Sequence, residues 1–153
     1  KLNQTNSSLF SASKIFAAVC LMGSIAIPGA EMSKASEEAR WEPYSPEVLA
    51  RLRSGGKPVL VNLTADWCIT CMVNERVALS SDAFYQALEN NNITYLKGDW
   101  TDSDPEITEL LNQYQRSGVP LYLLFPEGPG EAEILPQILL APVVLDVLNQ
   151  ANQ

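Results

Sequence analysis

Histidine is absent from the 153 residues of this chain, and positively charged residues are few. Without histidine, the Ser-His and Cys-His arrangements of hydrolases are excluded, and most catalytic zinc sites are excluded with them. Ten Lys and Arg oppose eighteen Asp and Glu, the net charge is −8, and no basic cluster occurs. Nucleic-acid binding is therefore not expected. The acidic residues are spread through the chain, which is typical of a solvated surface.

Cysteine is scarce as well, because the three cysteines are too few for a disulfide framework. Two of them form Cys68-Ile-Thr-Cys71, and Cys20 stands apart in an apolar run, where we expect a packing role. A metal site usually adds a second cysteine pair or histidines. Two thiolates can still bind copper(I), so a copper-binding or metal-tolerance module stays as an alternative. With 46% hydrophobic residues, the chain has enough apolar side chains for one folded domain plus an appendage.

Long hydrophobic runs are limited to one segment, Ile15 to Ile27, which is shorter than the roughly twenty residues of a membrane-spanning helix. Three interpretations remain open: a signal-peptide core with Lys14 as its basic flank, a membrane anchor or last transmembrane helix of a larger protein, and a buried helix of a soluble protein. We expect an export or membrane segment in residues 1–30, because a polar linker follows in residues 31–45. The folded domain is then expected in residues 46–153, outside the cytoplasm.

The central stretch of the chain is a short apolar run that leads into the cysteine pair. Val59 to Leu63 is rich in β-branched residues and predicts a buried strand. The residues after Cys71 predict a helix, so the strand delivers Cys68 to a helix N-terminus. The positive end of a helix dipole favours the thiolate of Cys68 over its thiol. Cys71 lies one helical turn further on, close enough to form a disulfide with Cys68.

The flanking sequence predicts further helices and strands. The segment Trp41 to Pro46 is expected to be a rigid connector, and Gly118 is expected to end the helix that precedes it. The other helices are expected to start at Pro46, after Ser80 and Ser81, near Pro105 and near Pro142, and the other strands to span Ile93–Lys97, Leu121–Phe125 and Ala132–Leu135. The predicted order from the central strand onward is β-α-α-β-α-β-β-α, preceded by one helix.

These motifs carry a resemblance to a known family. Ala65-Asp-Trp-Cys-Ile-Thr-Cys71, followed by Gly118-Val-Pro120, resembles the thioredoxin superfamily. Cys71-x-x-x-Glu75, Lys97-Gly-Asp-Trp-Thr101 and Ser117-Gly-Val-Pro-Leu-Tyr122 resemble, more narrowly, the C-terminal domain of the DsbD/ScsB-type thiol:disulfide interchange proteins. The resemblance covers Trp41 to Asn149. It implies an α/β, thioredoxin-like fold with a mixed central sheet flanked by helices, here preceded by the N-terminal hydrophobic segment.

The resemblance also implies roles for individual residues. Cys68 is expected to be the nucleophile with a lowered pKa, and Cys71 the resolving thiol that attacks the mixed disulfide on Cys68. Trp67 is expected to line the surface beside the cysteines, or to pack half-buried. The Val119–Pro120 bond is expected to be cis and to lie against the cysteines, where the neighbouring backbone offers hydrogen bonds to a substrate chain.

One position departs from the pattern of the related domains, which have a buried carboxylate six residues before the first cysteine. Here that position is Asn62, which cannot ionise. Glu75 matches a second carboxylate of the DsbD-type domains and is one helical turn from Cys71. It is therefore expected either to accept the proton of Cys71, directly or through water, or to face solvent. Asp66 is the other acidic candidate, although a surface charge is its more ordinary role.

By this resemblance the protein is a protein-disulfide reductase in the periplasm, membrane-tethered or exported. It would take electrons from a membrane-embedded dithiol donor and pass them to oxidised periplasmic proteins through the redox-active Cys68–Cys71 disulfide, as a monomeric domain with no organic cofactor or metal. Ile69-Thr70 contains neither the proline of reducing thioredoxins nor the histidine of strong oxidants, which indicates a mid-range potential on the reducing side. Alternatives are a disulfide oxidase or isomerase, a cytochrome-maturation reductase, the copper-binding module, and an interaction domain without catalysis.

Overall fold

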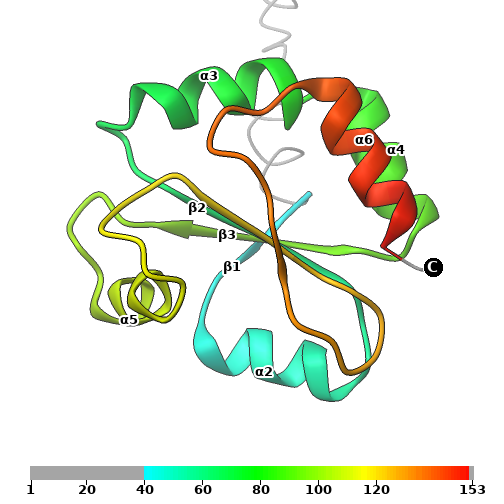
Figure 1. Ribbon diagram of the computed structural model, residues 1–153, viewed down its shortest axis with the longest axis horizontal. Coiled ribbons are helices and arrows are strands. Elements are labelled where there is room, and N and C mark those ends of the chain that lie inside the picture. The colour runs from blue at the N-terminus through cyan, green and yellow to red at the C-terminus, as the bar shows by residue number, and fades with distance from the viewer. Residues whose placement is uncertain (1–39, 152–153) are drawn as a thin grey trace, which may run out of the picture. The chain divides into compact units, whose positions relative to one another are not determined.

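A five-stranded mixed sheet lies at the centre of the computed structural model, which describes residues 40–151 (Figure 1). The strands are β1 (Glu42–Pro43), β2 (Val59–Thr64), β3 (Thr94–Asp99), β4 (Leu121–Phe125) and β5 (Glu133–Ile134), and their order across the sheet is β1-β3-β2-β4-β5. β3 is parallel to both β1 and β2, whereas β4 is antiparallel to β2 and β5. The predicted thioredoxin-like fold, a mixed sheet flanked by helices, is confirmed.

Five helices cover the two faces of the sheet within the described residues: α2 (Pro46–Ser54), α3 (Ile69–Ala78), α4 (Asp82–Asn90), α5 (Pro105–Gln113) and α6 (Ala141–Gln150). Their starts follow local rules. The hydroxyls of Ser45 and Ser81 accept from the backbone N–H groups of Val48 and Phe84, which satisfies one free donor in the first turn of α2 and of α4. The helix starts predicted from these caps are therefore found in place.

The core consists of two layers because successive side chains of a strand point to opposite faces of the sheet. On one face, Leu60 of β2 packs with residues of α3, α4 and α6, including Phe84 and Leu148. On the other face, Val61 and Leu63 pack against α2 and α5. Every residue of β2 is buried, which fits a central strand covered on both sides. The strand that leads to the cysteines is thus held rigidly from both faces.

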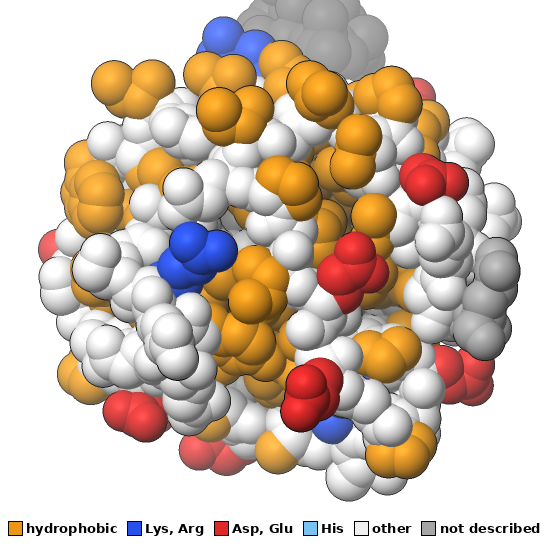
Figure 2. All heavy atoms as spheres, in the orientation of Figure 1, with side chains coloured by type: hydrophobic (Ala, Val, Ile, Leu, Met, Phe, Trp, Pro, Cys, Tyr) orange, Lys and Arg blue, Asp and Glu red, His pale blue; other side chains and the backbone are white. Residues whose placement is uncertain are grey.

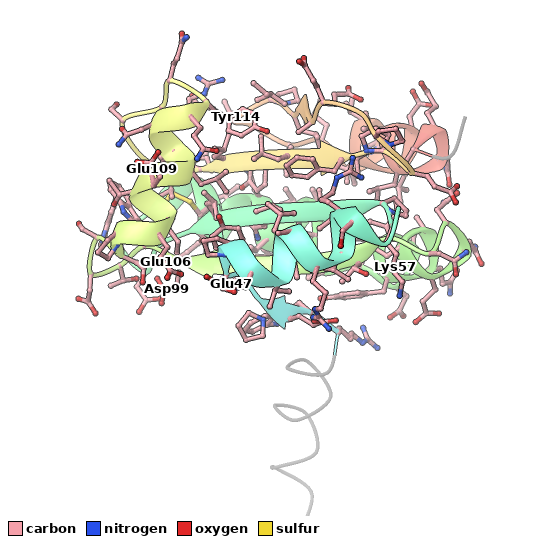
Figure 3. The ribbon with its side chains drawn as sticks, turned by 90° about the horizontal axis from the view of Figure 1, so that it is seen from below. Glu47, Lys57, Asp99, Glu106, Glu109 and Tyr114 are labelled. Atoms are coloured by element: carbon pink, nitrogen blue, oxygen red, sulfur yellow. A yellow bond between two sulfur atoms is a disulfide. The ribbon has the colours of Figure 1, made fainter. Side chains whose placement is uncertain are left out.

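The corner where α2 approaches α5 carries several carboxylates, and Figure 3 shows Glu47 on α2 and Glu106 on α5. The phenol of Tyr44 lies among them. Burial, followed by the nearby charges of Glu106 and Glu47, raises the pKa of Tyr44 to about 12. Tyr44 also borders the groove that is lined by Glu75 and Lys97, so this corner reaches the edge of the cysteine site.

The structure differs from the sequence prediction at two places. Glu42–Pro43, expected within a rigid connector, forms the edge strand β1 and pairs with Leu96 and Lys97. A two-residue strand has no alternating pattern, and it exists only because β3 supplies the partner backbone. Gly118 does not end α5, as the helix stops at Gln113 and the chain turns through Gln115, which has a positive φ of 54°. The expectations for residues 1–30, including Cys20, lie outside the described residues.

Candidate active site: a cysteine pair at the start of helix α3

The two cysteines lie where β2 leads into α3. After Thr64 the chain makes a tight turn, in which the Cys68 N–H donates to the Ala65 carbonyl at 3.0 Å. Cys68 is the N-cap residue of α3, and its sulfur accepts a hydrogen bond from the Cys71 N–H at 3.2 Å. The cysteines form a disulfide with a Cα–Cα distance of 5.2 Å. Because that N–H also remains available when the disulfide is open, the helix N-terminus favours a Cys68 thiolate.

The two cysteines differ in how far they reach the surface. Cys68 is 7% exposed, whereas Cys71 is completely buried behind it. Both pack with Ala65 and Val119 in a small apolar cluster. A thiolate that approaches from solvent therefore meets Cys68 first, which fits the expected order of nucleophile and resolving thiol.

The predicted cis bond between Val119 and Pro120 is found in the structure. It lies just before β4, and Val119 contacts the cysteine cluster. The turn at the start of β4, far from the cysteines in sequence, is thereby placed against them, as expected.

Trp67 lies on the surface beside Cys68 with 55% of its area exposed. Its ring centroid is 5.9 Å from that of Trp100, and its indole N–H donates to the Thr101 carbonyl at 3.2 Å. The hydroxyl of Thr101 in turn accepts from the backbone N–H of Asp66 at 2.9 Å. Trp100 and Thr101 thus hold the loop before Cys68. The motif Lys97-Gly-Asp-Trp-Thr101 marked this segment, but no role for these two side chains was predicted.

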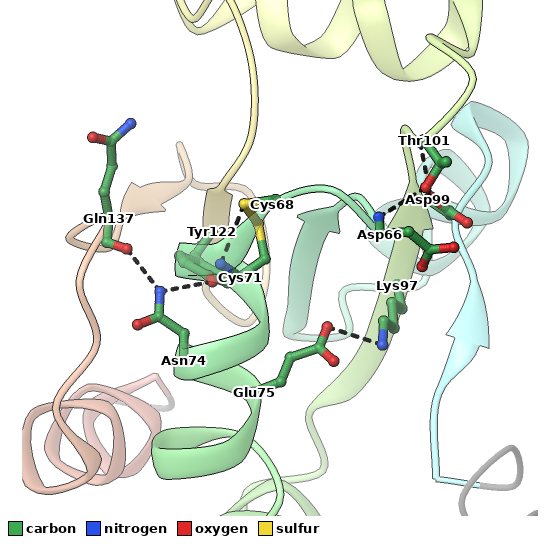
Figure 4. The surroundings of a disulfide bond; sticks show 10 residues. All are labelled: Asp66, Cys68, Cys71, Asn74, Glu75, Lys97, Asp99, Thr101, Tyr122 and Gln137. Atoms are coloured by element: carbon green, nitrogen blue, oxygen red, sulfur yellow. Dashed lines mark hydrogen bonds and ion pairs between the residues drawn. A yellow bond between two sulfur atoms is a disulfide. The ribbon is translucent and has the colours of Figure 1, made fainter.

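Asp66 is exposed, and it is the backbone rather than the carboxylate of this residue that is tied to Thr101. Figure 4 shows the Asp66 side chain on the β3 side of the site, together with Asp99 and Thr101. This position fits the role of a surface charge.

A row of polar residues crosses the sheet beneath α3. Asn62 of β2 is paired in register with Lys97 of β3 on one side and with Tyr122 of β4 on the other. Directly paired residues point to the same face, here the face that α3 covers. Asn74 and Glu75 of α3 reach down to the two ends of this row, at Tyr122 and Lys97 respectively (Figure 4).

Asn74 is a buried polar residue of α3 that belongs to none of the sequence motifs. Its Nδ2 donates to the Tyr122 hydroxyl at 2.9 Å and to the Gln137 carbonyl at 2.7 Å, and its Oδ1 accepts from the Leu139 N–H at 3.1 Å. It ties α3 to β4 and to the segment before α6. Burial raises the pKa of Tyr122 to about 12. No sequence pattern marked Asn74, because its partners are distant in the chain.

Glu75 forms an ion pair with Lys97, with 2.9 Å between Oε1 and Nζ. Its side chain is 32% exposed, and both residues line a groove of about 460 Å³ that also borders Asp66 and Met72. The carboxylate therefore lies between the buried row and solvent. Whether it serves Cys71 stays a prediction.

Hydrophobic side chains gather on the surface around the cysteines and along α3, and Figure 2 shows many of them over α3 and α6. On and beside α3 the exposed ones are Trp67, Ile69, Met72, Val73 and Val77, and around the start of α6 they are Ile138, Leu140 and Val143. An exposed apolar surface of this kind at a reactive site is typical of a protein-binding surface.

Within residues 40–151, no three Cys, Asp or Glu side chains are grouped so that they could hold a metal ion. None of the helices in this same range is long and apolar enough to cross a bilayer.

A mixed sheet of this order, with a Cys-x-x-Cys pair at a helix start and the residue before a cis proline packed against that pair, defines the class of thioredoxin-fold disulfide oxidoreductases. A family model described as thioredoxin-like matches residues 40–127, and the chain belongs to this family. The predicted class is confirmed.

Two curated relatives show which thioredoxin-like proteins this chain resembles in sequence. The chain is 40% identical over 83 residues to the thiol:disulfide interchange protein DsbD 1 of Pseudomonas aeruginosa, and 35% identical over 85 residues to DsbD of Klebsiella pneumoniae. These matches cover 54% and 55% of this chain but 14% of each relative. The chain thus corresponds to about a seventh of the length of these relatives.

The fold is shared with two solved structures. The reduced C-terminal domain of Neisseria meningitidis DsbD aligns with a TM-score of 0.58 and 23% identity, covering 72% of this chain and all of that domain. A thioredoxin from Thermus thermophilus aligns with a TM-score of 0.59 and 27% identity, covering 72% of this chain and 85% of that one.

Proposed function

We propose that this domain is a protein-disulfide reductase that works outside the cytoplasm. It takes electrons from a membrane-embedded dithiol and passes them to oxidised periplasmic proteins. The curated relatives named DsbD support this role, and residues 40–127, which the family model matches, include the cysteine pair. The observation that carries the proposal is the placement of Cys68 at the helix N-cap and near the surface, with Cys71 buried directly behind it.

The exchange proceeds in two displacements. The Cys68 thiolate attacks one sulfur of the substrate disulfide, so that a mixed disulfide forms and the other substrate sulfur leaves as a thiolate. Cys71 then loses its proton and attacks the Cys68 sulfur, which releases the second substrate thiolate and closes the Cys68–Cys71 disulfide. Two electrons pass to the substrate. A membrane dithiol then reduces the Cys68–Cys71 disulfide by the same two displacements, in which the membrane dithiol is the attacking pair.

Glu75 is the proposed acceptor of the Cys71 proton. It lies on the same helical face as Cys71, one turn further on, and its ion pair with Lys97 lies beside a groove that opens to water. Asn62 cannot take this role because an amide has no basic site in this range. The exposed side chains around Cys68, Trp67 and Ile69 among them, offer the substrate an apolar contact surface.

The reduction potential of the Cys68–Cys71 pair tests the direction of electron flow. The protein is equilibrated with glutathione mixtures, and mass-tagging of free thiols, mapped to individual peptides, reports the reduced fraction. A potential at or below about −220 mV is expected, toward the thioredoxin end of the scale. A potential near −120 mV, like that of strong oxidants, would instead make the domain an oxidase. In parallel, Cys71→Ser should accumulate mixed disulfides with an oxidised model protein, whereas Cys68→Ser should form none.

A further inference from the structure

The buried amide of Asn62 has one end without a partner. Its Nδ2 donates to the Tyr95 hydroxyl at 2.8 Å, whereas its Oδ1 is buried and has no hydrogen-bond partner among the described residues. The side chain is completely buried. Buried acceptors are nearly always paired, so an unpartnered Oδ1 marks a position where a nearby donor would be stabilised.

The contacts of α3 show what lies above this amide. Asn62 stands between Lys97 and Tyr122 in the sheet, and α3 reaches these two neighbours with Glu75 and Asn74 (Figure 4). Cys71 precedes Asn74 by three residues and Glu75 by four, so all three side chains share one face of the helix. The Asn62 amide therefore lies beneath the face of α3 that carries Cys71, between the two residues that Asn74 and Glu75 reach one helical turn further on.

The other titratable and charged groups on this face already have partners. Lys97 pairs with Glu75, the Tyr122 hydroxyl accepts from Asn74, and the Tyr95 hydroxyl accepts from the other end of the Asn62 amide. Burial raises the pKa of both tyrosines, so they stay neutral. The two tyrosine hydroxyls each keep an O–H of their own, but Asn62 Oδ1 has no hydrogen-bond partner among the described residues, so neither hydroxyl reaches it. Cys71 is the side chain on this face whose donor capacity changes, because reduction gives it a proton.

We propose that Asn62 Oδ1 is the hydrogen-bond acceptor of the Cys71 thiol in the reduced protein, and that Asn62 thereby shifts the redox equilibrium toward the dithiol. In the oxidised protein the Cys71 sulfur is bonded to Cys68 and carries no proton. A donor dithiol supplies two electrons and two protons, the S–S bond breaks, and the donor becomes a disulfide. Cys71 takes one proton and becomes a thiol, whereas Cys68 becomes a thiolate and the second proton passes to solvent. Only then does Oδ1 gain its partner. Asn62 is in this sense a positioning residue for Cys71.

The inference rests on the proposed function, since it concerns the same cysteine pair, but its test depends only on differences between variants. Asn62→Leu removes the acceptor and keeps an apolar group of comparable size. Tyr95→Phe is the matched control, because it removes the partner of Nδ2 and leaves Oδ1 in place. The equilibrium constant for reduction by glutathione is measured for the full chain and both variants, and thermal unfolding verifies that each variant is folded.

Asn62→Leu is expected to lower the equilibrium constant for reduction about tenfold, which corresponds to about 30 mV toward a more reducing potential. Tyr95→Phe is expected to change it less than twofold. An unchanged constant in Asn62→Leu, or an equal change in Tyr95→Phe, would overturn the inference. An absolute potential near that of the strong oxidants would refute the proposed reductase and leave this difference intact, so the two failures are distinguishable.

A second measurement uses the unaltered protein and does not depend on the folding of a variant. In carbon-detected NMR, the Asn62 side-chain carbonyl resonance is expected to move downfield on reduction, as a carbonyl does when it accepts a hydrogen bond. The Asn74 side-chain carbonyl, whose Oδ1 already accepts from Leu139, serves as the internal control and is expected to move much less. Equal behaviour of the two resonances would show that Asn62 gains no donor on reduction.

Discussion

Glu75 and Lys97 form an ion pair at the edge of the cysteine site, with their charged atoms 2.9 Å apart. Lys97 is the register neighbour of Asn62, the position where related domains have a buried carboxylate. The negative charge of this site is therefore on helix α3 and at a solvent groove, rather than on the central strand. Because the carboxylate is at position 75 rather than at position 62, a substitution of Glu75 is the one that tests the proton transfer.

Glu75→Gln is expected to slow the resolution of the mixed disulfide by about one to two orders of magnitude, because Cys71 then loses its proton acceptor. Lys97→Met is expected to slow it less, since the carboxylate remains but is no longer held. Stopped-flow thiol release from a mixed disulfide with a small aromatic thiol measures the rate. Glu89→Gln, on the exposed side of α4, is the control. Equal rates for Glu75→Gln and the control would leave Glu75 a structural ion-pair residue.

Asn74→Ala is expected to lower the free energy of unfolding by about 2–4 kcal/mol, because three hydrogen bonds of a buried side chain are lost and their partners stay buried. Tyr122→Phe removes one of these partners and is expected to cost about 1 kcal/mol. Urea unfolding of the oxidised protein measures both. A loss in Asn74→Ala no larger than in Tyr122→Phe would mean that the contacts to Gln137 and Leu139 contribute nothing.

Stability is expected to fall at alkaline pH. Burial raises the pKa of Tyr122 to about 12, above the unfolded value of about 10, and it raises that of Tyr95 as well. The folded protein thus holds these protons more tightly than the unfolded chain. This contribution to the free energy of unfolding is fully present below about pH 10 and is lost as the pH rises through about 12. For Tyr122 the loss is about 2–3 kcal/mol. Urea unfolding across this range should show a shallower decline for Tyr122→Phe, and parallel declines would contradict the assignment.

Arg53 is expected to stabilise the domain without affecting the redox reaction. Its guanidinium donates to the carbonyls of Lys57, Pro126, Gly128 and Gly130 and lies 5.2 Å from the centroid of the Phe125 ring. Arg53→Met is expected to cost about 1–3 kcal/mol in urea unfolding, since two partly buried carbonyls, those of Pro126 and Gly128, lose a donor. The glutathione equilibrium of this variant should match that of the unaltered protein. A change in that equilibrium would show that the loop at Pro126 communicates with the cysteines.

Arg53→Lys separates charge from geometry at this position. A lysine keeps the positive charge but cannot reach several carbonyls with a planar fork of donors. It is expected to recover less than half of the stability that Arg53→Met loses. Full recovery would indicate that charge alone accounts for the effect.

The helix starts and the cysteine pair were predictable from the sequence because their causes are local. Ser45 and Ser81 bond to backbone groups three residues away, and the Cys68 cap depends on the same short spacing. The end of α5 was not predictable, as Gln115 rather than Gly118 takes the positive φ. Gly118 lies against the Trp100 ring instead, a contact made across eighteen residues of sequence.

By itself, the sequence determined the class of this protein: a buried strand, then Trp67 and a Cys-x-x-Cys pair at the start of a helix, and a distant Val-Pro. Only the tertiary structure decided what lies around the resolving cysteine. The polar residues in this region come from one helix and three strands: Asn62, Asn74, Glu75, Lys97 and Tyr122. Strand register and helix packing set the partner of each of these side chains. Register and packing depend on contacts across the whole chain, so no local pattern encodes which polar group meets which.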